Sequence, residues 1–194
     1  MPMTSEIIQK IRALLSEKDL VLVAIDGRCA SGKTTLARTL LSHFDANLFH
    51  MDDFFLRPEQ RTESRLSEAG GNVDRERFLA EVLLPLEMGN AFSYRPYDCG
   101  SQALGASIVV SPKRLNIVEG SYSCHPLLFD RYDLHVFMTV TEDEQLRRIR
   151  LRDGETKAEI FRTRWIPMEE RYFSAFDIQD RCDLIISCEN TEKR

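Results

Sequence analysis

The sequence predicts an α/β protein in which helices cover both faces of a parallel sheet. Segments rich in aliphatic and β-branched residues alternate along the chain with segments whose apolar residues recur at helical spacing. The segment LVLVAI at 20–25 is apolar without interruption, which is typical of a strand buried on both faces. Because strands alternating with helices indicate βαβ units, we expect the strands to be parallel.

The elements follow one another in a regular order. A helix is predicted where apolar residues recur between Ile7 and Leu15, and a strand follows at 20–25. The same criteria predict a helix around 36–41, a strand at 46–51, a helix at 78–86, strands at 115–119 and 133–140, a helix at 142–152 and a last strand at 183–187.

Two segments interrupt this alternation. Residues 57–75 are charged and rich in turn-forming residues, so we expect a mobile loop there. Residues 91–111 contain short β-like runs at 92–97 and 107–111, which predict a hairpin beside the main sheet.

Size and composition limit the classes of function. The 194 residues suffice for one domain, and we take 1–194 as a single domain. The net charge of −5 argues against a nucleic acid as the main partner, whereas one local basic site is enough to bind a small phosphorylated ligand. No feature of the sequence indicates an oligomeric state.

The sequence predicts a cytoplasmic protein that does not enter a membrane. The longest purely apolar run, 20–25, is far shorter than the roughly 20 residues of a membrane span, and the start of the chain lacks the pattern of a secretory signal. The five cysteines are odd in number, scattered and without a CxxC pair, so we interpret them as reduced thiols.

A phosphate-binding loop follows the first predicted strand. DGRCASGKTT matches the pattern GxxxxGK[ST], and a helix is predicted directly after it, which is the context that this motif requires. Backbone N–H groups of such a loop surround phosphate oxygens, while the lysine reaches the β and γ phosphates and the following hydroxyl binds Mg²⁺. The predicted ATP-binding residues are Gly27, Arg28, Cys29, Ala30, Ser31, Gly32, Lys33, Thr34 and Thr35, with Thr34 also a metal ligand.

Carboxylates occur near the ends of two other predicted strands. Asp52 and Asp53 lie in the apolar stretch NLFHMDDFFL, where a carboxylate needs partners or water. Because successive side chains of a strand point to opposite sides, we expect the two aspartates to have different roles. Glu119 ends LNIVE, a strand that we expect beside the loop-bearing strand, where it can hold Mg²⁺ through water. Solvated turns are the alternative interpretation of both sites.

Several segments together resemble the uridine kinase family of P-loop kinases. They are IDGRCASGKTT, MDDFF, NVDRERF, YRPYD, IVEG, RRIRLRD and CDLII, and they span nearly the whole chain in the family's order. The elements of GTPase switches, motor ATPases and transporter ATPases are missing. The resemblance implies a five-stranded parallel sheet with flanking helices, a lid at about 147–165, the cofactors ATP and Mg²⁺, and a small molecule whose hydroxyl group accepts the phosphoryl group.

The resemblance also assigns roles to individual residues. It implies that Asp52 is the base for the acceptor hydroxyl, that Asp74 binds a sugar hydroxyl, that Tyr97 contacts the acceptor, and that Arg148 and Arg152 neutralise phosphate charge from the lid. On the residues alone, Asp74 could instead cap the following helix, Tyr97 could pack in the hairpin, and the arginines could form a solvated helix face.

The chain departs from the family pattern on the acceptor side. The Arg-Gly pair that follows the lid motif in many relatives is replaced by RDGETKAEIFRTRW, Gln102 or a neighbour stands near the position of a base-reading histidine, and Arg75 stands where tryptophan is frequent. Arg164 or Trp165 could face the acceptor, or Trp165 could be a core anchor. From the resemblance, uridine or cytidine is the first expectation for the acceptor. The departures leave two alternatives: a kinase of another alcohol, such as a vitamin precursor or sugar phosphate, and a nucleotide-binding regulator.

Overall fold

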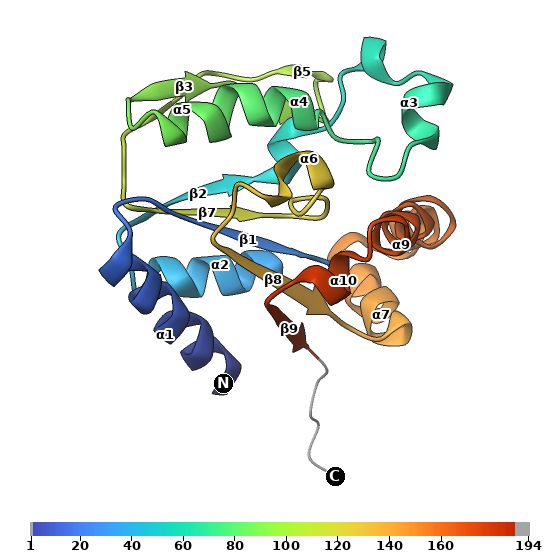
Figure 1. The fold of residues 1–194 in the computed structure, drawn as a ribbon. Coiled ribbons are helices and arrows are strands. Elements are labelled where there is room, and N and C mark those ends of the chain that lie inside the picture. The colour runs from blue at the N-terminus through green and yellow to red at the C-terminus, as the bar shows by residue number, and fades with distance from the viewer. Residues whose placement is uncertain (1, 189–194) are drawn as a thin grey trace.

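The computed structural model describes residues 2–188. Five parallel strands form the central sheet in the order β2-β7-β1-β8-β9 (Figure 1). Their bounds are Val21–Gly27 for β1, Ala46–His50 for β2, Leu115–Glu119 for β7, Leu134–Thr139 for β8 and Leu184–Ser187 for β9. The predicted fold class, a five-stranded parallel sheet flanked by helices, is confirmed.

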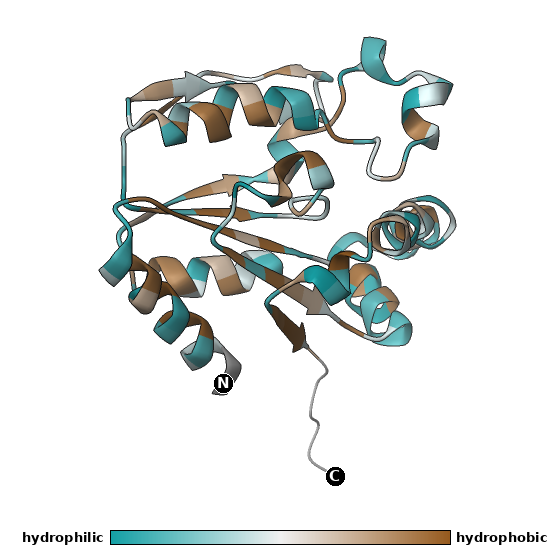
Figure 2. Cartoon of the chain, viewed as in Figure 1, coloured by the Kyte–Doolittle hydropathy of each residue, from teal (hydrophilic) through white to brown (hydrophobic). Residues whose placement is uncertain are grey.

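Helices cover the two faces of the sheet and create two apolar cores. On one face, α1 (Pro2–Glu17) and α2 (Lys33–Leu41) pack against Val21, Val23 and Ile25 of β1. On the other face, Leu22 and Ala24 of the same strand belong to a second core that includes residues of the helical segment 75–87, of α6 (Pro126–Phe129), of α9 (Ile166–Ala175) and of α10 (Ile178–Arg181). The uninterrupted apolar character of β1 therefore reflects burial on both faces (Figure 2).

The helical segment 75–87 consists of α4 (Arg75–Phe78), a π-helical turn η3 (Leu79–Leu83) and α5 (Leu84–Glu87). A second π-helical turn, η4 (Phe161–Trp165), lies between α8 (Glu155–Ile160) and α9. Both turns end two residues before a proline, Pro85 and Pro167. A proline removes one hydrogen bond and clashes with the carbonyl four residues earlier, so a locally widened helix is the physical consequence.

The segment 57–75 contains more regular structure than the loop that the sequence predicts. It contains η2 (Pro58–Gln60) and α3 (Glu63–Ser67). The guanidinium group of Arg65 organises it, because this group donates to the carbonyls of Gly71 and Val73 and pairs with Glu76 at 2.7 Å. The side-chain contacts of this one arginine supply the order that the turn-rich composition hides.

The predicted hairpin is present, and a second, shorter pair of strands lies within it. Strand β3 (Phe92–Tyr94) pairs antiparallel with β6 (Ile108–Val110), and β4 (Tyr97–Asp98) pairs with β5 (Ala103–Leu104) between them. The hairpin packs on the sheet through Phe92 and Tyr94, whose rings lie 6.4 and 6.0 Å from that of Phe49 in β2.

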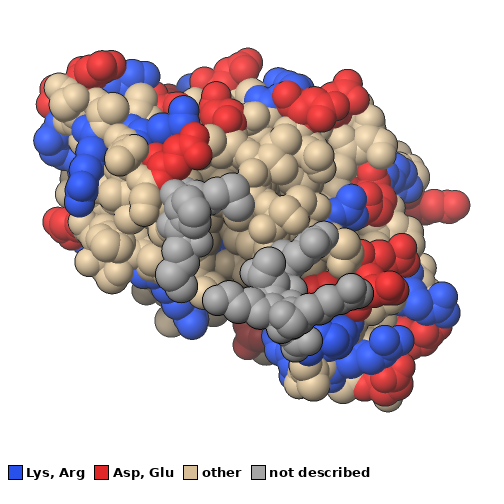
Figure 3. Space-filling view, turned by 90° about the horizontal axis from the view of Figure 1, so that it is seen from below, with Lys and Arg blue, Asp and Glu red and all other residues tan. Residues whose placement is uncertain are grey.

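Acidic and basic side chains are interspersed on the face of the molecule that Figure 3 shows. On the face seen from below, Figure 3 shows both signs around the margin with uncharged residues between them, so the described residues visible there form no extended patch of one sign. Within residues 2–188, no helix has both the length and the apolar character needed to cross a bilayer.

Candidate functional site

The phosphate loop connects the end of β1 to the start of α2. Gly27 has a φ of 125°, and a Cβ atom there would lie 2.0 Å from the carbonyl oxygen of Met138 in the neighbouring strand β8. Gly32, directly before α2, has a φ of 101°. Both positions therefore require glycine, the first because of close packing and the second because of its left-handed conformation.

Lys33 lies over this loop and is almost fully buried. Its ammonium group donates to the carbonyl oxygens of Gly27 and Arg28, each at 2.8 Å, and to the Ser121 hydroxyl at 3.4 Å. The hydroxyl group of Ser31 is also buried, and within the described residues it has no hydrogen-bond partner. A buried hydroxyl and a buried ammonium group at one loop form a site suited to an anion.

Glu119 lies at the end of β7, as predicted, directly beside the loop-bearing strand. It stands opposite Ile25 of β1 and His50 of β2 in the sheet register. Its Oε1 atom accepts a hydrogen bond from the hydroxyl of Thr34 at 3.0 Å and lies 2.6 Å from Nδ1 of His50. The hydrogen bond with the Glu119 carboxylate raises the pKa of His50, against the opposing effect of its burial.

Asp52 and Asp53 differ in environment, although the predicted reason is wrong. Strand β2 ends at His50, and both aspartates lie in a 3-10 helix, η1 (Met51–Phe54), so the alternation of a strand does not apply to them. Asp52 is open to the cavity described below. Asp53 accepts a hydrogen bond from the Tyr94 hydroxyl at 3.3 Å, and its carbonyl accepts one from Arg77.

The pKa of the Asp52 carboxyl group is raised. The walls of the cavity limit the hydration of this group, which is the largest effect, and the charge of Lys33 opposes it. Glu119 also raises the pKa of Asp52. A carboxylate whose ionised form is disfavoured in this way is a better proton acceptor once it is ionised.

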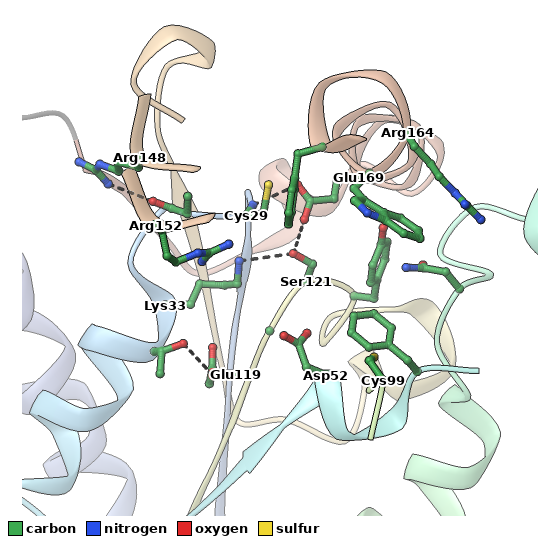
Figure 4. A pocket seen from close by; sticks show the side chains of 18 of the residues that line it. Cys29, Lys33, Asp52, Cys99, Glu119, Ser121, Arg148, Arg152, Arg164 and Glu169 are labelled. Carbon is green, nitrogen blue, oxygen red and sulfur yellow. Dashed lines mark hydrogen bonds between the residues drawn. The ribbon is translucent and has the colours of Figure 1, made fainter. Parts of the chain in front are cut away.

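Helix α7 (Glu142–Asp153) carries the two arginines predicted to belong to the lid. Arg148 pairs with Glu144 at 2.7 Å and donates to the carbonyl of Ala30 in the phosphate loop at 3.2 Å. Among residues 2–188, the ion-pair partner of Arg152 is its neighbour Asp153, at 2.8 Å, and the Arg152 side chain points into the cavity toward Lys33 (Figure 4). Both arginines line the same cavity as the phosphate loop.

Glu169 of α9 is a site residue that sequence analysis missed. It is buried, and its carboxylate accepts hydrogen bonds from the backbone N–H of Cys29 at 3.0 Å and from the Ser121 hydroxyl at 2.6 Å (Figure 4). The sequence did contain a signal for Glu169: it lies at helical spacing with Ile166 and Phe173, so a charged residue occupies the apolar face of its helix.

One cavity of about 680 Å³ connects these groups. The phosphate loop, Asp52 and the residues after β7 form one part, and residues of α7, η4 and the segment 55–72 close the rest. Arg164 and Trp165 both line the cavity, a position that the interpretation of these residues as facing the acceptor requires. The Arg164 guanidinium lies 4.5 Å from the Trp165 ring. Its lining residues from the phosphate loop and the start of α2 are Cys29, Ala30, Gly32, Lys33, Thr34 and Thr35.

Five predicted site residues are not among those that line this cavity: Gly27, Arg28, Ser31, Asp74 and Tyr97. Asp74 caps α4 by accepting from the N–H of Arg77 at 3.1 Å, which is the alternative that the sequence left open. The buried Tyr97 accepts a hydrogen bond at 2.8 Å from Arg61, which does line the cavity. Arg28 points away from the cavity, donates to Thr139 and forms an ion pair with Glu170.

The residues of this site fit a nucleotide with Mg²⁺. The unpartnered Ser31 hydroxyl, the Lys33 ammonium group and the N-terminus of α2 suit phosphate oxygens. The Thr34 hydroxyl and the Glu119 carboxylate supply oxygen atoms of the type that Mg²⁺ prefers. Within residues 2–188, no group of three or more His, Cys, Asp and Glu side chains could hold a metal ion.

Solved structures share this fold, whereas no protein-family model matches the sequence. A possible uridine kinase from Bacillus stearothermophilus is 20% identical, with a TM-score of 0.70 over 96% of this chain and 100% of that one. A candidate fructose transport system kinase from a Silicibacter species is 21% identical, with a TM-score of 0.67 over 86% and 89%. D-glycerate 3-kinase from Cryptococcus neoformans is 15% identical, with a TM-score of 0.63 over 87% and 86%. The chain therefore has the fold of P-loop small-molecule kinases.

Proposed function

We propose that this protein is a Mg²⁺- and ATP-dependent kinase that transfers the γ-phosphoryl group to a hydroxyl group of a small molecule. One observation carries the proposal: a single cavity joins the phosphate loop, a carboxylate with a raised pKa and two arginines from a separate helix. A transition state of phosphoryl transfer needs these three kinds of group, because catalysis depends on positioning and on charge neutralisation.

The proposed roles follow from the position of each side chain. Lys33 would exchange its loop carbonyls for phosphate oxygens, and Arg152, with Arg148 behind it, would neutralise charge on the transferred group. Thr34 and Glu119 would hold Mg²⁺, which supplies further charge neutralisation when it is bound. The acceptor oxygen forms a bond to the γ-phosphorus, the bond from that atom to the bridging oxygen of ADP breaks, and the hydroxyl proton passes to Asp52.

The acceptor is tested by measuring ADP release over a panel of nucleosides, vitamin precursors, sugars and sugar phosphates, beginning with uridine and cytidine. A kinase releases ADP faster when its acceptor is present. A nucleotide-binding regulator, the alternative from another class, would bind ATP without any acceptor raising turnover.

The pair Asp52→Asn and Asp53→Asn tests the mechanism with that acceptor. Asp52→Asn keeps size and shape but removes the base, so kcat should fall by about 10² to 10⁴ with ATP affinity nearly unchanged. Asp53→Asn is the matched control, because Asp53 bonds Tyr94 instead, and it should cost less than about tenfold. A larger loss in Asp53→Asn would refute the assignment of the base to Asp52.

A further inference from the structure

Two arginines line the cavity at positions remote from the phosphate loop. Arg61 comes from the segment between η2 and α3, and Arg164 comes from η4. Figure 4 shows Arg164 on the side of the cavity opposite Lys33, Arg148 and Arg152, with Cys99 also on that side. Arg61 belongs near Cys99, because its charge acts to lower the pKa of that thiol, whereas burial raises it.

Both guanidinium groups are held in place without an acidic partner. Arg61 donates through Nε to the Leu56 carbonyl at 3.0 Å and through Nη2 to the Tyr97 hydroxyl at 2.8 Å. Arg164 stacks on Trp165 at 4.5 Å. Within residues 2–188, neither arginine has a carboxylate within ion-pair distance of 4.0 Å. Two arginines that line one cavity and have no ion pair among the described residues are suited to bind an anion.

Arginines close to Arg61 and Arg164 in the sequence do form ion pairs with carboxylates. Arg57 pairs with Glu59, Arg65 with Glu76 and Arg162 with Glu159. The carboxylates that line the cavity, Asp52, Glu119 and Glu169, belong instead to the region near the phosphate loop. In the part of the chain that the structure describes, Arg61 and Arg164 thus remain without an ion pair, although Asp52 also acts on the Cys99 thiol at this part of the cavity.

Asn72 also lines the cavity and is 8% exposed. Its side chain interacts with Tyr122, and its Oδ1 atom has no hydrogen-bond donor within the described residues. The backbone of Asn72 is fixed, because its carbonyl accepts from the N–H of Leu56. A buried amide oxygen of this kind requires a donor, and a hydroxyl group of a ligand can supply one.

We propose that the phosphoryl acceptor is a small hydroxylated anion, whose carboxylate or phosphate group binds Arg61 and Arg164 while a second hydroxyl group donates to Asn72. This inference rests on the proposed kinase function and specifies its substrate class. The flat Trp165 ring beside Arg164 provides an apolar wall for the carbon skeleton. A neutral nucleoside would leave both guanidinium groups without a counter-charge.

Matched pairs of compounds test the substrate class. We would measure ADP release with gluconate against glucose, glycerate against glycerol, and ribose 5-phosphate against ribose, with uridine and cytidine as neutral nucleosides. At least one anion should exceed its neutral partner in kcat/KM by tenfold or more, roughly the effect of one charged hydrogen bond. Preference for the acids or for the phosphate identifies the anionic group.

Variants of Arg164 link that preference to the site. Arg164→Gln should raise KM for the anion by about 10- to 100-fold with a smaller change in kcat, because the arginine binds a group that does not react. Arg164→Lys, which keeps the charge, should restore part of this affinity. Arg162→Gln is the matched control, because Arg162 lies in the same π-helical turn and pairs with Glu159.

A binding measurement separates failure of this inference from failure of the kinase assignment. With Mg²⁺ and a non-hydrolysable ATP analogue present, the anions should raise the melting temperature of the wild type and have less effect on Arg164→Gln. A best acceptor that is neutral, or an absence of any shift with all the anions, overturns the inference while the nucleotide-induced shift persists. If nucleotide and Mg²⁺ alone do not raise the melting temperature of the wild type, the kinase proposal itself is refuted.

Discussion

Glu169 accepts a hydrogen bond from the backbone N–H of Cys29 at 3.0 Å, and so connects helix α9 to the phosphate loop. The other oxygen of the same carboxylate accepts from the Ser121 hydroxyl at 2.6 Å, and the oxygen of this hydroxyl lies 3.1 Å from the carbonyl oxygen of Gly27. One buried side chain thus holds two segments that form the floor of the cavity. Without it, the Cys29 N–H group would have no protein acceptor in this arrangement.

Glu169→Ala should lower the free energy of unfolding by about 1–3 kcal/mol, because it leaves a backbone donor without a partner in a largely buried place. Urea denaturation measures the change. Glu159→Ala is the control, since Glu159 is exposed and its carboxylate pairs with Arg162 on the outside of the same helical region. Equal stability of Glu169→Ala and wild type would mean that the loop holds its shape unaided.

Lys33→Ala should abolish most of the rise in melting temperature that ATP and Mg²⁺ produce. A ligand that binds only the native state stabilises it by mass action, and Lys33 is the buried cation of the phosphate loop. Differential scanning fluorimetry compares each variant with and without nucleotide, so any intrinsic effect of the substitution cancels. Lys10→Ala, an exposed change in α1, should keep the full shift. An undiminished shift in Lys33→Ala would exclude this lysine from phosphate binding.

The sequence predicts those features that depend on local pattern. The five strands have uninterrupted or alternating apolar residues, and the phosphate loop is a contiguous motif, so both could be located before the structure was known. Glu119 could be placed beside β1 because parallel strands end at the same edge of a sheet.

Other features depend on contacts that no local pattern shows. Glu169 meets Cys29 across 140 positions of the chain, and Arg65 orders the segment 57–75 through carbonyls and a carboxylate that the sequence does not single out. The turn that carries Asp52 is a 3-10 helix, although its residues read as the continuation of a strand. Asp74 caps α4 by accepting from the N–H of Arg77. An aspartate directly before a helix satisfies a free backbone N–H group whether or not it also binds an acceptor, so the sequence could not separate the two roles.

Stability should fall as the pH is lowered from about 6.5 to about 4, in part because of His125. Burial is the main reason why the pKa of His125 is lowered to about 4, and its Nδ1 atom accepts from the N–H of Leu127 at the start of α6. The unfolded chain takes up a proton near pH 6.5, which the native state does not, so protonation favours unfolding in this window.

The variant His125→Asn tests this pH dependence, because asparagine can still cap the helix but does not titrate there. The free energy of unfolding, measured in urea between pH 4 and 7, should depend less on pH in the variant, by at most one proton of linkage. His43→Asn, at an exposed histidine, serves as the control and should retain the wild-type dependence. Identical slopes for His125→Asn and wild type would show that His125 is protonated to the same extent in both states.

Arg152→Ala should affect turnover more than ATP binding. Its guanidinium group points into the cavity and is paired only with the adjacent Asp153, so its charge is available where negative charge develops on the transferred group. We expect kcat to fall by about 10² or more, the loss of one transition-state donor, with a smaller change in the dissociation constant for ATP. Steady-state kinetics and a nucleotide titration give the two values.

Arg150→Ala is the matched control, because Arg150 lies on the same helix and pairs with Glu155 outside the cavity. If Arg152→Ala and Arg150→Ala both kept wild-type turnover, Arg152 would belong to a solvated helix face, and Arg148, which bonds the Ala30 carbonyl, would be the remaining cation of α7 at the phosphate loop.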